Sequence, residues 1–123
     1  MNHRKDDFVT GRVKSFKYAL KGMWLLIKTE HSIMVQCAIG IMVVLLGWWF
    51  DISRIEWILQ ILAIGLVLVA ESLNTAIEKI CDFIHSDYHH KIGFIKDISA
   101  GAVSFAAISA LIIGLIIYLP KLV

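Results

Sequence analysis

Three long apolar stretches dominate the chain, and short polar segments separate them. The first runs from Ile33 to Phe50, eighteen residues in which Gln36 is the only polar side chain. The second begins near Ile55 and continues to about Ile84, and the third covers Ile98 to Leu119. Because a helix needs about 20 apolar residues to cross a bilayer, this pattern predicts membrane helices at 32–50, 55–84 and 97–119.

A further helix is expected ahead of these spans, over residues 8–28. Apolar residues recur at helical spacing along one face, and lysines gather along an adjoining face, at Lys14, Lys17, Lys21 and Lys28. A basic amphipathic helix of this kind lies in the membrane interface, with its apolar face in the acyl boundary and its lysines toward the headgroups. Packing against a cytosolic partner is the alternative. Residues 1–7 are polar, and we expect them to be loose.

The segments between the predicted helices contain residues typical of turns and of the membrane interface. Trp48, Trp49 and Trp57 flank the polar turn 51–56, an arrangement typical of an interfacial aromatic belt. The segment 85–96 is expected to be a polar connection with Gly93 as its helix breaker, and Pro120 is expected to end the last helix. Small residues along the third span, from Ser99 to Ala110, allow close helix packing.

Composition places the chain in the membrane. Hydrophobic residues make up 59% of the 123 residues and the mean hydropathy is +0.76, whereas soluble domains are about 45–50% apolar. We therefore predict an all-α integral membrane protein of one domain, 1–123, which oligomerises because a bundle this small buries little by itself.

Charge and cysteine content exclude other classes. A formal charge of +2 on apolar helices argues against a nucleic-acid-binding protein. Cys37 and Cys81 fall inside predicted helices, so no disulfide framework follows. The first 22 residues lack an apolar signal core, and we expect no removed peptide.

Lysine and arginine placement predicts the orientation. Of the twelve such residues, seven lie in the N-terminal segment and three between 79 and 97, while only Arg54 and Lys121 lie at the other ends of the spans. Since positive charge marks the cytoplasmic side, the N-terminus and the 79–97 region are predicted to be cytoplasmic, with the C-terminus outside.

Candidate chemistry lies in the second span, at its cytoplasmic end. Glu71, Asn74, Glu78 and Asp82 are spaced so that they fall within an arc of about 80° on a helix; we call them the acidic stripe. Acidic residues on a membrane helix are costly and are a functional hypothesis by default. A polar network that only fixes helix packing is the alternative.

The residue types indicate phosphoryl transfer beside a bilayer. Carboxylate and amide oxygens suit Mg²⁺, a lysine such as Lys96 suits a phosphate, and a further carboxylate can accept the proton of an attacking hydroxyl. No Gly-rich phosphate loop of the soluble-kinase type is present. Such a site would bring a water-soluble nucleotide to a lipid hydroxyl.

The chain resembles the small bacterial integral-membrane diacylglycerol kinases and their undecaprenol kinase relatives. The match is carried by Ala70-Glu-Ser-Leu-Asn-Thr-Ala-Ile-Glu78 with Asp82. It is supported by Gly11-Arg-Val-Lys-Ser-Phe-Lys17 with Lys21-Gly22, by the Glu30 that precedes the first span, and by Lys96-Asp97. Two positions depart from the family pattern: many members have an arginine where Met34 stands, and some have an asparagine where Ser32 stands.

The resemblance implies a role for each matching residue. Glu71 would be the catalytic base toward the lipid hydroxyl, and Glu71 and Asn74 would contact the lipid. Glu30 and Glu78 would hold the Mg²⁺ of ATP. Further contacts to phosphates and nucleotide would come from Arg12, Lys14, Asn74, Glu78, Lys96 and Asp97. The resemblance also implies a homotrimer in the bacterial inner membrane, whose active sites draw on neighbouring subunits.

Several of these residues could instead have roles outside catalysis and nucleotide binding. Glu30 could be a helix N-terminal charge, Asp82 a solvated residue beyond the interface, Lys96 a positive-inside lysine and Asp97 a helix cap. Arg12 and Lys14 are equally suited to lipid headgroups. The three histidines at 85, 89 and 90 have no second ligand pair at the fixed spacing of a zinc site.

The sequence thus predicts an ATP- and Mg²⁺-dependent lipid kinase. Diacylglycerol is the expected acceptor and undecaprenol the alternative, since nothing in three apolar spans separates a glycerolipid from a polyprenol. A different class of function is a cation- or proton-conducting oligomer. A pore would need polar groups through its full depth, however, and Trp57 to Ala70 contains only Gln60. A third alternative, an accessory subunit without chemistry, would tolerate loss of the Glu71 carboxylate.

Overall fold

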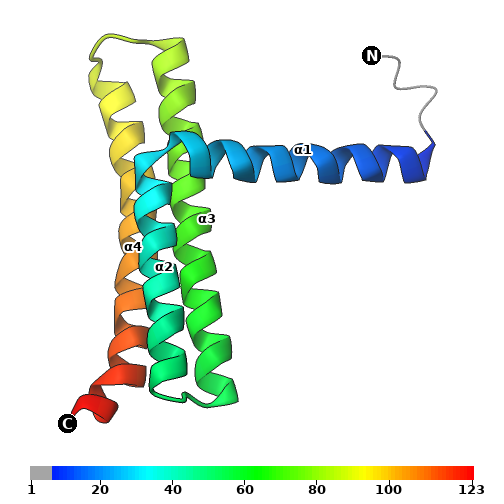
Figure 1. Ribbon diagram of the computed structural model, residues 1–123. Coiled ribbons are helices and arrows are strands. Elements are labelled where there is room, and N and C mark those ends of the chain that lie inside the picture. Colours follow the sequence, from blue (N-terminus) through cyan, green and yellow to red (C-terminus); the bar gives the residue numbers. More distant parts are fainter. Residues whose placement is uncertain (1–6) are drawn as a thin grey trace.

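The computed structural model describes residues 7–123, which form four helices. They are α1 (Phe8–Thr29), α2 (His31–Trp49), α3 (Arg54–Ile84) and α4 (His90–Leu122). Helices α2, α3 and α4 run up and down beside one another, and α1 lies across them (Figure 1). The expected all-helical fold is confirmed for these residues, whereas the expected looseness of residues 1–6 lies outside the described part of the chain.

Three of the helices are membrane spans by length and composition: α2, α3 and α4. Their outward side chains are large and apolar, including Ile41, Leu62 and Leu111, each more than half exposed to the surroundings of the single chain. Because exposed apolar surface of this extent is unstable in water, the bundle belongs in a bilayer, as the hydropathy predicts.

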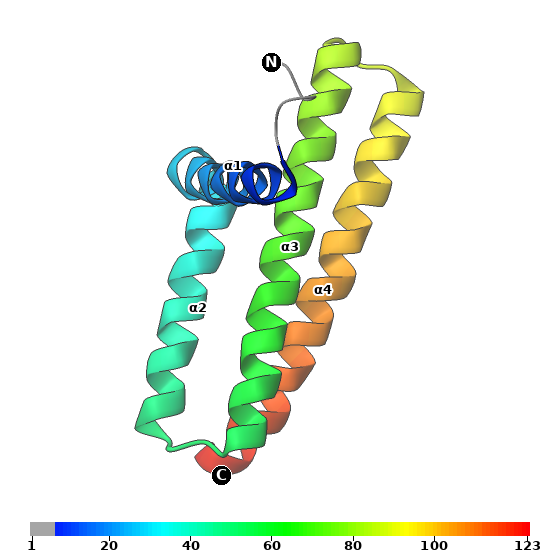
Figure 2. The ribbon, with the colours of Figure 1, turned by 90° about the vertical axis from the view of Figure 1, so that its right-hand side faces the viewer.

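Helix α1 has the placement expected of an interfacial helix. None of its residues is buried against the bundle, and Figures 1 and 2 show it crossing the bundle axis rather than running along it. Its start is capped by Asp7, whose Oδ1 accepts a hydrogen bond from the Thr10 backbone at 2.7 Å. Hydrogen bonds from the Thr10 side chain and backbone lower the pKa of Asp7, because they favour the charged carboxylate.

A tight turn joins α2 to α3. Asp51 has φ 49°, in the left-handed region that aspartate tolerates better than most residues. Ser53 then begins α3 with a capping box, in which its hydroxyl accepts from the Glu56 backbone and the Glu56 side chain accepts from the Ser53 backbone. The rings of Trp48 and Trp57 lie 6.1 Å apart beside this turn.

Gly47 allows α2 to approach α3 at this end of the bundle. A β-carbon at this position would lie 2.8 Å from the Trp57 ring. Gly47→Ala is therefore expected to lower the free energy of unfolding by about 1–3 kcal/mol, measured as thermal unfolding of the purified protein by near-ultraviolet circular dichroism.

Gly65→Ala is the matched control, because a β-carbon there meets nothing within 4 Å and alanine is about 1 kcal/mol better than glycine inside a helix. Its melting temperature should be unchanged or higher. Equal melting temperatures for Gly47→Ala and the wild type would contradict the close approach.

Helix α4 begins seven residues earlier than the expected start at residue 97, at His90. The connection after α3 is therefore shorter than expected, and Gly93 lies inside the helix instead of breaking it. The reason is packing, because Lys96 Nζ donates to Asp82 Oδ1 at 2.7 Å and holds the first turns of α4 against the last turns of α3. The two helices continue together past the level of α1 (Figure 2).

The other helix ends differ less from the sequence expectation. Helix α1 ends at Thr29, α2 covers His31–Trp49 and α3 begins at Arg54. Pro120 lies within the last turn of α4, which ends at Leu122, rather than stopping the helix before it. A proline removes one backbone hydrogen bond and crowds the turn before it. Because Pro120 is so close to the end of α4, this affects only the end of the helix.

Candidate active site

The acidic stripe lies on one uninterrupted helix, as the spacing predicts. Glu71, Asn74, Glu78 and Asp82 all belong to α3, whose 31 residues contain no break. Asn74 Nδ2 donates to Glu78 Oε1 at 3.2 Å, so these two side chains point the same way. Glu71 is half-buried, whereas Glu78 and Asp82 are exposed, which places Glu71 at the inner end of the stripe.

Asn74 has an oxygen that needs a partner. Its Oδ1 is buried and accepts no hydrogen bond from any residue that the structure describes. Buried polar atoms are rarely left without a partner, and an amide oxygen beside a carboxylate suits a cation or a hydroxyl donor. The stripe therefore contains one buried acceptor without a partner among the described residues.

Glu30 contacts α3 beside the stripe, from the junction of α1 and α2. It stands between α1 and α2 with extended backbone, φ −104° and ψ 115°, and Lys79 Nζ lies 3.1 Å from its Oε1. Since Lys79 follows Glu78 directly, the junction of α1 and α2 meets α3 in the turn that holds Glu78. The structure thus brings Glu30 to the level of Glu78 on α3, at Lys79, which lies about 100° around the helix from Glu78.

Lys96 reaches the outer end of the stripe from α4. Its ion pair with Asp82 is partly solvent-accessible, with side-chain exposures of 37% and 59%. Exposed ion pairs contribute only about 0–1 kcal/mol, so a bound phosphate can compete for this lysine. Asp97 is exposed on the next position of the same helix, and Asp82 is an ion-pair partner rather than only a solvated residue.

Arg12 and Lys14 lie elsewhere in the single chain. Both belong to the far half of α1, where the Arg12 guanidinium lies 5.6 Å from the centre of the Phe8 ring. Eighteen residues separate Arg12 from Glu30, about 27 Å along a helix. Figure 1 shows α1 leading away from α3 toward its N-terminus. Within a single chain, Arg12 and Lys14 therefore do not reach the stripe. Their expected role near the nucleotide stays a prediction.

Metal ligands are sparse within the single chain. Across residues 7–123, no three histidine, cysteine, aspartate or glutamate side chains are grouped so that they could hold an ion. The three histidine rings after α3 pack on one another, with His89 and His90 stacked at 4.7 Å and His89 Nδ1 accepting from the Lys91 backbone. A divalent cation at the stripe would therefore be coordinated by few protein oxygens and would need further ligands from outside the chain.

Sequence reasoning missed a second polar cluster, at the opposite end of the bundle. The Tyr118 hydroxyl on α4 contacts both Gln60 Oε1 on α3 and the carbonyl oxygen of Val43 on α2. Lys121 Nζ donates to Glu56 Oε2 at 3.0 Å nearby. Gln60 was visible as the lone polar residue of its apolar stretch, but its partners come from helices that only the fold brings together.

Comparison with known proteins identifies relatives along most of the chain. A family model described as prokaryotic diacylglycerol kinase matches residues 17–118. The undecaprenol kinase of Bacillus subtilis is 40% identical over 109 residues, 89% of each chain. The diacylglycerol kinase of Escherichia coli is 33% identical over 100 residues, 81% of this chain and 82% of the relative. That of Haemophilus influenzae is 30% identical over 102 residues, 83% of this chain and 86% of the relative.

Proposed function

The chain belongs to the prokaryotic diacylglycerol kinase family of membrane-embedded lipid kinases, and from this premise we propose that it transfers the γ-phosphate of ATP to the hydroxyl of undecaprenol. The identity of 40% to an undecaprenol kinase against 33% to a diacylglycerol kinase favours the polyprenol. Diacylglycerol, the acceptor expected from the sequence, is the second candidate.

The proposed reaction uses the acidic stripe at the edge of the bilayer. The lipid hydroxyl oxygen attacks the γ-phosphorus, the bond between that phosphorus and the β-phosphate oxygen breaks, and ADP leaves. Glu71 takes the hydroxyl proton, because its half-buried carboxylate lies at the inner end of the stripe, where a headgroup hydroxyl would enter from the membrane. Asn74 orients that hydroxyl, and its unpartnered Oδ1 is the observation that supports this contact.

The oxygens of the stripe fit Mg²⁺ bound with ATP. Glu78 and Glu30 would hold the ion through their carboxylate oxygens, which are hard ligands. Mg²⁺ commonly takes one or two carboxylates and completes its shell with water and phosphate, which suits the small number of carboxylates here. When bound, the ion would neutralise charge on the phosphates. Lys96 and Asp97 would contact the nucleotide further out on α4.

Glu78→Gln is expected to raise the Mg²⁺ concentration for half-maximal phosphate transfer by about 10–100-fold, the range found when groups around a metal are altered. The matched control is Glu56→Gln, which changes the same residue type at the other end of α3, where Glu56 pairs with Lys121. The Mg²⁺ requirement of both variants is measured by titrating Mg²⁺ at a fixed ATP concentration. An unchanged Mg²⁺ requirement for Glu78→Gln would remove Glu78 from the metal site.

We further propose a homotrimer in the bacterial inner membrane, with the N-terminus and the stripe cytoplasmic and the C-terminus outside. The placement of ten of the twelve basic residues on the stripe side supports this orientation. Helix α1 supports shared sites, since it carries Arg12 and Lys14 away from the stripe of their own chain.

The decisive experiment is phosphate transfer from γ-labelled ATP with Mg²⁺ to undecaprenol, a short-chain diacylglycerol and a sphingoid alcohol, each in mixed micelles with purified protein. We expect the highest kcat/KM for undecaprenol. A preference for diacylglycerol would select the second candidate. Labelling of none of these lipids by folded protein would contradict the proposed reaction and would favour the conducting oligomer, which liposome flux would then test.

A further inference from the structure

Lys79 is a cation beside the stripe that has no role in the proposed reaction. It belongs to α3 and follows Glu78 directly. Its Nζ lies 3.1 Å from Glu30 Oε1, at the junction of α1 and α2. Glu30 is one of the two carboxylates proposed to hold Mg²⁺, so the ammonium occupies a position that the ion would need. The role inferred here for Lys79 rests on the proposed function, because it takes Glu30 as a metal ligand.

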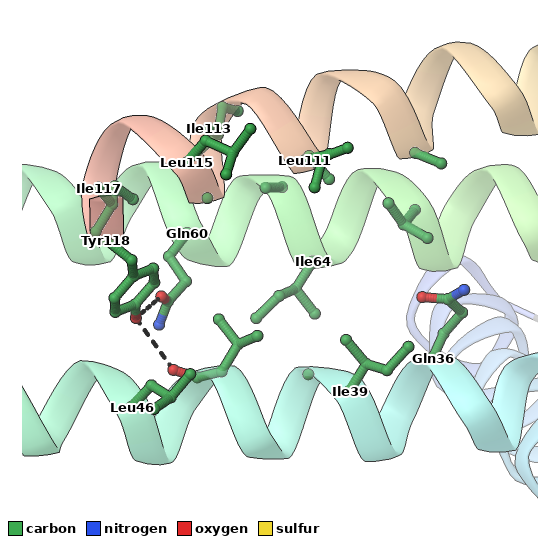
Figure 3. A pocket seen from close by; sticks show the side chains of 17 residues that line it. Gln36, Ile39, Leu46, Gln60, Ile64, Leu111, Ile113, Leu115, Ile117 and Tyr118 are labelled. Carbon is green, nitrogen blue, oxygen red and sulfur yellow. Dashed lines mark hydrogen bonds between the residues drawn. The ribbon is translucent and has the colours of Figure 1, made fainter. Parts of the chain in front are cut away.

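The ion pair is open to solvent on its lysine side. The Lys79 side chain is 69% exposed, whereas that of Glu30 is 22% exposed. The ion pair at the other end of α3 is more enclosed, since the Lys121 side chain is only 25% exposed. The Tyr118 hydroxyl at that end also contacts oxygens of α2 and α3 (Figure 3). Exposed ion pairs contribute little to stability, so Lys79 can leave Glu30 with little loss of stability.

Carboxylates outnumber cations around the stripe of a single chain. The carboxylates that the structure describes there are those of Glu30, Glu71, Glu78, Asp82 and Asp97. Of the cations proposed to contact the nucleotide, Lys96 lies at the stripe, whereas α1 leads Arg12 and Lys14 away from it. Carboxylates repel a polyphosphate, and phosphoryl transfer depends on neutralising the charge of the phosphates. A further ammonium group at this place would favour nucleotide binding.

Lys79 has the reach and the chemistry for that contact. A lysine ammonium has three donors on a flexible four-carbon stem and binds phosphate as a point charge. Phosphates that share a metal ion with Glu30 would come close to its carboxylate, which Lys79 Nζ already contacts. The same side chain can therefore pair with Glu30 in the empty site and with phosphate oxygens in the occupied one.

We propose that Lys79 is a further phosphate-binding residue, whose ammonium pairs with Glu30 in the empty site and moves to the nucleotide phosphates when Mg²⁺ takes its place at Glu30. In the empty site Lys79 balances the charge of a largely enclosed carboxylate. In the occupied site it adds one positive charge beside the polyphosphate. Lys79 thus competes with the metal ion by itself and assists the metal–nucleotide complex.

Lys79→Met keeps an unbranched side chain of similar length and removes the charge. Two equilibrium measurements on purified protein in detergent test its effect without turnover. Binding of Mn²⁺ alone, a paramagnetic substitute for Mg²⁺, is measured from the electron paramagnetic resonance signal of the unbound ion. Binding of β,γ-methylene-ATP with Mg²⁺ is measured by isothermal titration calorimetry.

The two affinities should change in opposite directions. Mn²⁺ alone should bind Lys79→Met about 2- to 5-fold more tightly, because it no longer displaces an ammonium from Glu30. The nucleotide analogue with Mg²⁺ should bind about 3- to 20-fold more weakly, the range for one solvent-exposed hydrogen bond to a charged group. An ion pair that only fixed the α1–α2 junction would change both affinities in the same direction or neither.

Two variants serve as controls. Lys121→Met breaks a lysine–glutamate pair at the other end of α3, and both affinities should stay within about twofold of wild type. Lys79→Arg keeps the positive charge, and its affinity for the nucleotide analogue should stay within about threefold of wild type.

Two results would overturn the role of Lys79 alone. Equal affinity of Lys79→Met and wild type for the nucleotide analogue would remove the phosphate contact. Weaker Mn²⁺ binding by Lys79→Met would show that Lys79 positions Glu30 for the ion instead of competing with it. In both cases phosphate transfer by the wild type would leave the proposed kinase reaction standing. A wild-type protein that bound no nucleotide analogue would contradict the proposed function itself, and the role of Lys79 with it.

Discussion

Glu71→Gln is expected to lower phosphate transfer by about 10²–10⁴-fold, the usual contribution of a general base. The amide has the shape of the carboxylate but cannot take the proton of the lipid hydroxyl. Because Glu71 makes no hydrogen bond or ion pair with another residue that the structure describes, the substitution breaks no contact within the chain. Helical content and melting temperature should therefore match those of the wild type.

The measurement is initial-rate phosphate transfer at saturating ATP and lipid, so that kcat is compared rather than binding. Glu56→Gln again serves as the control, because it changes a glutamate of the same helix at the opposite end of the bundle. We expect it to keep nearly full kcat. A Glu71→Gln protein with wild-type kcat would remove Glu71 as the base and would leave the stripe as a packing or binding feature.

Mixed oligomers of two inactive variants are expected to regain about a quarter of wild-type activity. The variants are Arg12→Gln and Glu71→Gln, each tested alone first and expected to be at least tenfold impaired. In this structure α1 leads Arg12 away from the stripe of its own chain, so a complete site would combine Arg12 of one subunit with Glu71 of its neighbour. Random assembly at equal amounts would restore about one site in four in a cyclic oligomer.

The control pair uses two residues that one chain brings together. Glu30 reaches the stripe of its own α3 through Lys79, at 3.1 Å, so Glu30→Gln mixed with Glu71→Gln should regain no activity. Activity is measured after co-dissociation and reassembly of the two purified proteins. If activity returned with the Glu30→Gln pair but not with the Arg12→Gln pair, the neighbouring subunit would supply Glu30, and Arg12 would act in its own chain. An Arg12→Gln protein of full activity would place Arg12 at lipid headgroups.

Much of the fold could be predicted from the sequence because membrane helices are constrained locally. Backbone groups in hydrocarbon must be satisfied within the segment, so apolar length alone located α2 and α3 to within one or two residues of their observed ends. The predicted start of α4 is seven residues too late because this local constraint does not act there. That end lies in a polar region, where the Asp82–Lys96 ion pair, a contact between two helices, decides how far the helix extends.

The candidate site was predictable where it lies on one helix. The spacing of Glu71, Asn74 and Glu78 determines their common face through the 3.6-residue period alone, and the observed bond from Asn74 to Glu78 agrees with it. What each of these side chains meets across the bundle has no local signal. The approach of Glu30 to Lys79 depends on how the α1–α2 junction packs against α3.

The sequence by itself determined that this protein spans a membrane, where its helices run, and which carboxylates share a face, since each follows from hydropathy and helical period over neighbouring residues. Only the tertiary structure decided that Glu30 meets Lys79 beside the stripe, that α1 carries Arg12 away from the stripe, and that Gln60 on α3 meets Tyr118 on α4. These features join residues far apart along the chain. Their positions depend on helix packing, which no local pattern of residues encodes.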